Sequence, residues 1–126
     1  MSIKKNNIEF LKPHFRYKDS RGTINGIFNN YKIEEVNVIT SKANTLRGRH
    51  YHTKTIEILH VVKGELQLFF SSIKNTKKIL KKINVKEGQT VTILPYQFHW
   101  SYNKKKAQWI NFLTKRFNQK KPDIYN

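Results

Sequence analysis

Short segments of alternating residues, rich in β-branched and aromatic side chains, recur along the chain. The five clearest occupy residues 34–40, 56–62, 64–70, 90–94 and 108–113. Turn-forming residues separate them, and Gly64 and Gly88 stand where a tight turn needs a positive φ or a close backbone approach. No window keeps a helical period. The sequence therefore predicts an all-β fold of closely connected strands, either a sandwich or a small barrel.

The length of 126 residues suits one domain, spanning 1–126, which can bury a core large enough to fold unaided. Cysteine is absent, which excludes disulfides, thiolate metal sites and cysteine nucleophiles and fits a reducing compartment. The longest apolar runs fall far short of the roughly 20 residues that a membrane helix needs, and the N-terminus holds no hydrophobic signal core. We therefore expect a cytoplasmic protein without a membrane partner.

The formal net charge is +17, from 25 Lys and Arg against 8 Asp and Glu. Such a field attracts phosphates of any kind, in nucleic acids and sugar diphosphates alike. Lys, Asn and Ile are abundant along the whole chain, a composition that drift in an AT-rich genome also produces. No nucleic-acid-binding motif is present in the sequence. The densest lysine runs, at 74–82 and 103–108, fall where hairpin turns are expected and are interpreted as solvated loops. Nucleic acid is therefore not the partner we expect.

A cluster of titratable residues lies between positions 47 and 65. His50 and His52 are two apart, so in an extended chain both side chains leave on the same face, as a chelating pair requires. The polar insert at 53–55 supplies a turn that resets the alternation and lets Glu57 join that face. His60 then falls on the other face, outward or toward a neighbouring subunit, and is interpreted as structural.

His99, which follows a strand-like segment and a proline turn, completes the group. A lone histidine in a strand is more often packed or solvated than ligating, but three imidazoles and a carboxylate form a ligand set for a divalent transition metal. The sequence therefore predicts a metal site at His50, His52, Glu57 and His99. Zinc is the first candidate, with iron, manganese or nickel as alternatives.

The same residues resemble the two motifs of the cupin superfamily. The first motif is a His-x-His pair followed by Glu and Gly, and the second carries Gly, Pro, His and Asn. Their counterparts here are His50, His52, Glu57 and Gly64, then Gly88, Pro95, His99 and Asn103. Tyr96 departs from the pattern, since a glycine usually precedes the last histidine, and the upstream glycine is displaced to Gly48. The resemblance implies a double-stranded β-helix, a jelly-roll barrel with the metal inside its mouth.

Segments 17–28, 46–52 and 115–125 narrow the resemblance to cupins that act on nucleotide-linked keto-sugars. These include dTDP-4-dehydrorhamnose 3,5-epimerases, dTDP-sugar 3,4-ketoisomerases and the C-terminal cupin of bifunctional capsular polysaccharide enzymes. The last is most similar, through its Arg-Gly-x-His-x-His motif, its glutamate and a terminal Pro-Asp-x-Tyr. The resemblance implies an isomerase or epimerase of a nucleotide-linked 4-keto-6-deoxy sugar in surface polysaccharide biosynthesis. The alternative is a non-catalytic metal-binding cupin that binds a small sugar-like ligand.

The carbonyl of a 4-keto sugar acidifies the hydrogen on C3, so a base can remove it if the enolate oxygen is stabilised. A metal can polarise that carbonyl as a Lewis acid. Alternatively, His50 and His52 act directly, one as the base and one at the oxygen. Tyr102 and Lys54 are further candidate proton donors. Sequence alone leaves both mechanisms open, and the complete ligand set favours a bound metal.

Arginines of the matching motifs are implied contacts for the substrate diphosphate, because a guanidinium pairs with phosphate in a bidentate manner. They are Arg21 and Arg47, although Arg21 can equally form a salt bridge with Asp19. Arg49 alternates with Arg47 across a glycine, so the role is open to either. We also expect a homodimer, in which the apolar stretch 8–15 packs across a two-fold axis.

Overall fold

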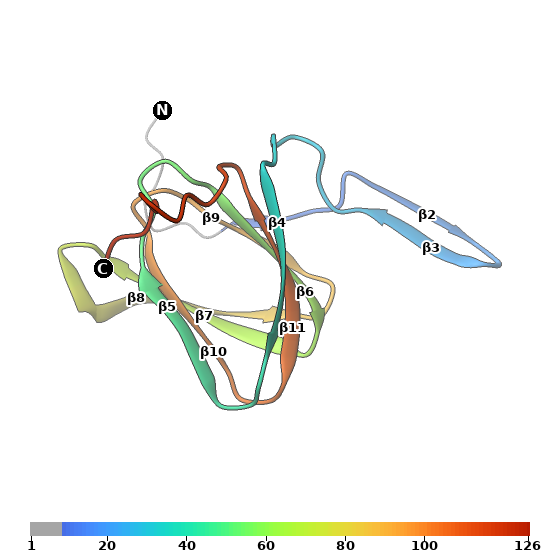
Figure 1. Ribbon diagram of the computed structural model, residues 1–126. Coiled ribbons are helices and arrows are strands. Elements are labelled where there is room, and N and C mark those ends of the chain that lie inside the picture. The colour runs from blue at the N-terminus through green and yellow to red at the C-terminus, as the bar shows by residue number, and fades with distance from the viewer. Residues whose placement is uncertain (1–8) are drawn as a thin grey trace.

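Two antiparallel sheets face each other and form a jelly-roll barrel, from which a hairpin projects to one side (Figure 1). The computed structural model describes residues 9–126. Within that range the strands are β1 (Glu9–Leu11), β2 (Phe15–Asp19), β3 (Gly22–Gly26), β4 (Glu35–Ser41), β5 (Thr45–His50), β6 (Glu57–Lys63), β7 (Glu65–Ser72), β8 (Asn75–Lys86), β9 (Thr90–Ile93), β10 (Phe98–Asn103) and β11 (Ala107–Leu113). The order is β1-β9-β6-β11-β4 in one sheet and β5-β10-β7-β8 in the other. The all-β, double-stranded β-helix prediction is confirmed.

No helix occurs between residues 9 and 126, so this part of the chain offers none that could span a membrane.

The core lies between the two sheets and follows from strand alternation. Every second side chain of the central strands points inward, where it loses its contact with water. The buried cluster comprises Leu59, Val61, Leu66, Leu68, Phe70, Val85, Val91, Ile93, Ala107 and Trp109. Each fully buried large aliphatic or aromatic side chain contributes about 1.5–3 kcal/mol. Polar side chains are also buried, among them His52, His99 and Asn111.

All five strands that the sequence predicts are present, as β4, β6, β7, β9 and β11. The interpretation of the lysine run 74–82 as a loop was wrong, because nearly all of it belongs to β8, and the turn is confined to residues 73–74. β8 pairs with β7 alone among the described strands, so most of its side chains remain exposed and lysines are tolerated. The second lysine run was interpreted correctly, since residues 104–106 connect β10 to β11.

The hairpin of β2 and β3 was not predicted as strands. Its two strands pair only with each other, and Figure 1 shows them extending away from the barrel. Its apolar side chains are largely exposed, with Phe15 at 46%, Tyr17 at 53% and Ile24 at 58%. A two-stranded hairpin is marginally stable by itself in water. This arm therefore presents an apolar surface that the barrel of its own chain does not cover.

Candidate metal and acid–base site

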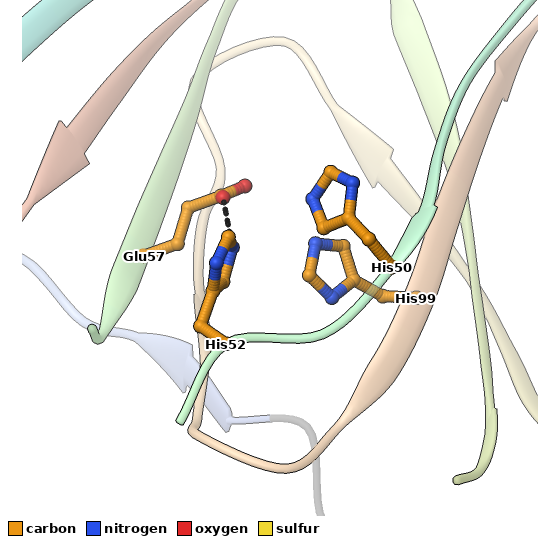
Figure 2. Close-up of side chains that lie close together, drawn as sticks. All are labelled: His50, His52, Glu57 and His99. Atoms are coloured by element: carbon orange, nitrogen blue, oxygen red, sulfur yellow. Dashed lines mark hydrogen bonds and ion pairs between the residues drawn. The ribbon is translucent and has the colours of Figure 1, made fainter. Parts of the chain in front are cut away.

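The structure brings together the four residues that the two sequence motifs single out. His50 ends β5, Glu57 begins β6, His99 lies in β10 directly opposite His50, and His52 follows β5. Each offers one ligand atom, and these atoms all lie within 4.8 Å of one another. Figure 2 shows the side chains converging, with Glu57 and His52 on one side and His50 and His99 on the other. One small ion can be reached by all four.

A β-bulge beside this group determines which arginine faces it. The pairing of β5 with β10 shifts so that His50 opposes His99 while Gly48 opposes Trp100, which leaves Arg49 as the extra residue. Arg49 has a φ of 67°, and its guanidinium lies 4.7 Å from the centre of the Trp100 ring. Bulges re-aim side chains in this way. The extra residue lets Arg47 line the same cavity as His50.

The prediction that Arg49 shares a face with Arg47 was therefore wrong. Arg49 stacks on the outer face of the sheet, over Phe98 and Trp100. Arg47 points into the barrel, where its Nε donates to the hydroxyl of Ser41 at 3.1 Å.

Backbone carbonyls orient two of the imidazoles. The Nδ1 of His52 lies 2.6 Å from the carbonyl oxygen of Asp123, and the Nδ1 of His99 lies 2.9 Å from that of Gln97. A carbonyl can only accept, so in both rings Nδ1 carries the proton and Nε2 is the ring atom left for a ligand. Histidines that bind metals usually donate their other N–H to such a carbonyl. The residues present therefore fit a divalent transition metal.

Burial and the charges of neighbouring groups shift the pKa values of the four residues in different directions. Burial, together with the neighbouring histidines, lowers the pKa of His50 to about 4, and burial also lowers that of His99. Burial opposes protonation of His52 too, but its hydrogen bond to Glu57 and the Glu57 charge outweigh burial and raise its pKa. Burial alone would raise the pKa of Glu57, yet the His52 hydrogen bond and the three imidazoles lower it to about 2. Glu57 is therefore a carboxylate at neutral pH.

Two hollows surround the group, and His50 and Glu57 line both. The inner one, of about 150 Å³, lies inside the barrel and is lined by His50, Glu57 and His99 together with Arg47. The outer one, of about 340 Å³, shares His50 and Glu57 and is bordered by the C-terminal segment. That volume lies within the range of about 300–1,000 Å³ of small-molecule sites. A larger hollow of about 540 Å³, lined by surface residues from Gly64 to Lys105, contains none of the four converging residues.

Three other predicted site residues lie away from this group. Arg21 is bound to Asp19 at 2.6 Å in the hairpin turn, which is the salt bridge weighed as its alternative role. The hydroxyl of Tyr102 donates to Asn44 at 2.8 Å, and Lys54 is exposed on the turn after His52. None of the three lines either hollow, and their substrate-binding and proton-donor roles stay predictions.

His60 lies on the other face of β6 from Glu57, as the alternation predicts, and its Nδ1 is 2.8 Å from the Thr90 hydroxyl. Tyr96, at the position where cupins usually have glycine, keeps a left-handed φ of 64°. Its N–H donates to the carbonyl of His52 at 2.7 Å. The turn before His99 therefore keeps a glycine-like backbone despite the tyrosine side chain.

Sequence reasoning missed the contribution of the C-terminal segment. Lys115, Arg116 and Asp123 line the outer hollow, as does Asn111 from β11. The terminal Pro-Asp-x-Tyr lies far from the histidines in the sequence, and no local pattern indicates that it returns to them.

The model of one protein family matches most of this chain. Residues 17–125 match the family described as polysaccharide biosynthesis C-terminal domain. The chain belongs to this family. No curated protein sequence matches the chain significantly.

Solved structures similar to this family member share its fold. The capsular polysaccharide assembling protein CapF from Staphylococcus aureus is 23% identical with a TM-score of 0.67, and the match covers 88% of this chain and 31% of that one. The chain thus spans about a third of the length of CapF. A 3,4-ketoisomerase from Helicobacter canadensis is 16% identical with a TM-score of 0.78, covering 94% and 89%.

QdtA, a sugar 3,4-ketoisomerase from Thermoanaerobacterium thermosaccharolyticum crystallised with TDP, is 16% identical with a TM-score of 0.74, covering 94% of this chain and 87% of QdtA. At these identities the likeness shows the jelly-roll fold and no more.

Proposed function

We propose that this domain is an isomerase or epimerase that moves a proton next to the ketone of a nucleotide-linked 4-keto-6-deoxy sugar, in polysaccharide biosynthesis. The observation that carries the proposal is the convergence of three histidines and a glutamate on a cavity inside the barrel. Environments that push neighbouring pKa values apart are typical of acid–base sites. The family match and the fold shared with two sugar ketoisomerases support the choice of substrate.

Two residues of the site suit the two roles that such a reaction needs, a base at C3 and a hydrogen-bond donor at the ketone oxygen. His50 is neutral at neutral pH because burial lowers its pKa, so its ring can accept the C3 proton. The electron pair of that bond forms the enolate, whose oxygen can take a hydrogen bond from protonated His52, kept charged by Glu57. Delivery of a different proton to C3 from the opposite face gives the epimer. Delivery to C4, together with transfer of the O3 proton to O4, moves the ketone to C3 and leaves a hydroxyl at C4.

As the alternative to catalysis by charged His52, we propose that His50, His52, Glu57 and His99, with His52 neutral, hold a divalent transition metal, zinc first, with iron, manganese or nickel as alternatives. Such an ion supplies Lewis-acid polarisation of the substrate carbonyl when it is bound. The fixed Nδ1 protons of His52 and His99, which leave Nε2 as the ligand atom, support this assignment.

Cations at the two hollows suit the charged end of the substrate. Arg47 reaches the inner hollow, and Lys115 and Arg116 line the outer one. We propose that the sugar enters the inner hollow and that Lys115 and Arg116 face the diphosphate, since guanidinium and ammonium groups bind phosphate oxygens.

Incubation of the protein in deuterated buffer with dTDP- and UDP-linked 4-keto-6-deoxyhexoses should place deuterium at C3, as followed by NMR. Exchange that a chelator abolishes supports the metal mechanism, and chelator-resistant exchange that still needs the histidines supports direct acid–base catalysis. No exchange from a folded, metal-loaded sample would refute the enzyme proposal. That result would favour the alternative, a non-catalytic metal-binding cupin that takes a small sugar-like ligand.

We propose that the domain is a homodimer in which the β2–β3 arm covers the partner barrel. Of the apolar stretch first expected at the two-fold axis, Ile8 lies outside the described residues, and 9–11 pair with β9 of the same chain. The arm exposes Tyr17 and Ile24, and β4 exposes Val36 at 55% and Val38 at 66%. One chain thus carries two apolar surfaces that a second copy can cover.

Light scattering at micromolar concentration should return twice the 15.1 kDa of one chain. The double variant Ile24→Lys with Val38→Lys should return a monomer, because it places charge on both surfaces. A wild-type monomer would contradict the dimer.

A further inference from the structure

The C-terminal Pro-Asp-x-Tyr segment lies against the residues that carry the His50-x-His52 pair. Tyr125 pairs with Tyr51, the residue between the two histidines, through two backbone hydrogen bonds of 2.9 and 3.0 Å. Their rings also stack with centres 5.5 Å apart. The end of the chain therefore acts as a short partner strand for the metal-motif backbone, although it comes from the opposite end of the domain sequence.

The carboxylate of Asp123 holds the turn that follows His52. It accepts hydrogen bonds from the backbone N–H groups of Thr53, Lys54 and Thr55, each at 2.9 Å. The hydroxyls of Thr53 and Thr55 add bonds of 2.7 and 2.8 Å. Burial would raise the pKa of Asp123, but these donors outweigh it and lower the pKa. The side chain works as an ionised acceptor for five donors.

The backbone carbonyl of the same residue accepts the Nδ1 proton of His52 at 2.6 Å. On the other side of the ring, Nε2 lies 3.2 Å from a carboxylate oxygen of Glu57. Both neighbours accept, so a neutral ring with a single proton can satisfy only one of them. The shorter contact to Asp123 favours the proton on Nδ1, which leaves the Nε2 lone pair directed at Glu57 and the cavity.

We propose that Asp123 is a positioning residue, which anchors the C-terminal segment so that its carbonyl holds neutral His52 in the Nδ1–H form. The carboxylate fixes the turn after His52, and the carbonyl fixes the ring. Without this anchor, Glu57 is the remaining acceptor and draws the proton to Nε2. A proton there blocks the lone pair that a metal needs. This inference rests on the proposed function and deepens it, because it names the residue that fixes the orientation and the tautomer of His52. The measurements that test it do not require catalytic turnover.

The test combines nitrogen NMR of histidine with zinc binding, on the full chain. At about pH 9, well above the ordinary histidine pKa near 6.5, the chelated wild type should show His52 protonated at Nδ1. Asp123→Ala should move the proton to Nε2 and weaken zinc binding about 10- to 100-fold, the usual effect of losing an outer hydrogen-bond partner. Asp123→Asn should shift both readouts in the same direction, because an amide has one accepting oxygen instead of two.

Asp19, the other aspartate of the chain, supplies the matched control. It accepts from Arg21 in the projecting hairpin, so Asp19→Asn should change neither readout. A wild-type ring protonated at Nε2, or a folded Asp123→Ala with unchanged tautomer and zinc affinity, would overturn the proposal. If Asp123→Ala does not fold, Asp123→Asn decides by the same readouts. A wild type that shows the Nδ1 tautomer but no deuterium exchange would refute only the proposed reaction.

Discussion

His50→Ala and His52→Ala should each lower the rate of deuterium exchange at C3 by about 100-fold or more, the range for losing a general acid or base. Each substitution removes a ligand atom from the group that lies within 4.8 Å, together with one of the two proposed proton positions. Zinc affinity, measured by competition with a chromophoric chelator, should fall in the same variants.

His60→Ala is the matched control for these substitutions. His60 lies in the same strand as Glu57, but its ring is on the other face and bonded to Thr90. Its replacement should leave exchange and zinc affinity within about twofold of the wild type, as for a substitution outside the site. An active His50→Ala or His52→Ala variant would contradict the site assignment, and so would a His60→Ala variant as impaired as the other two.

Gly64→Ala should destabilise the barrel by about 3 kcal/mol or more, through backbone strain and overpacking together. Gly64 has a φ of 83°, and a Cβ there would lie 2.8 Å from the carbonyl oxygen of Lys106 and 3.2 Å from Ala107. Both contacts lie on the neighbouring chain segment, so neither can move aside cheaply. Urea unfolding followed by tryptophan fluorescence measures the loss.

Gly88→Ala separates the two causes. Gly88 has nearly the same φ, 85°, but a Cβ there would meet nothing within 4 Å. This variant carries only the left-handed strain of alanine and should lose about 1 kcal/mol. If both variants lost the same free energy of unfolding, the close approach of residue 64 to Lys106 would not contribute to stability.

The four-residue group was predictable because its geometry depends on local alternation. His50 and His52 are two positions apart, with Tyr51 between them, and the turn at 53–55 resets the alternation for Glu57. The five apolar strands were predictable for the same reason. Their inward positions carry the large side chains of the core.

The missed features depend on contacts that local pattern does not encode. The Asp123–His52 contact joins residues 71 positions apart, and only the closed barrel brings them together. Arg49 left the face of Arg47 because a bulge interrupts the alternation, with a positive φ that a non-glycine residue seldom adopts. The β2–β3 hairpin pairs only with itself, and its second strand has a single large apolar residue, Ile24, so it lacks the alternating pattern of the core strands.

The lysines of β8 lie on an edge strand, where they have a structural role. It is twelve residues long, and one side of its backbone has no strand partner among residues 9–126. Such an edge is a template on which another chain can add a strand, and lysines are a common means by which proteins block that addition. The lysines of the strand are Lys77, Lys78, Lys81, Lys82 and Lys86. Two copies that approach along this edge bring like charges together, and we expect the resulting repulsion to keep barrels from joining sheet to sheet.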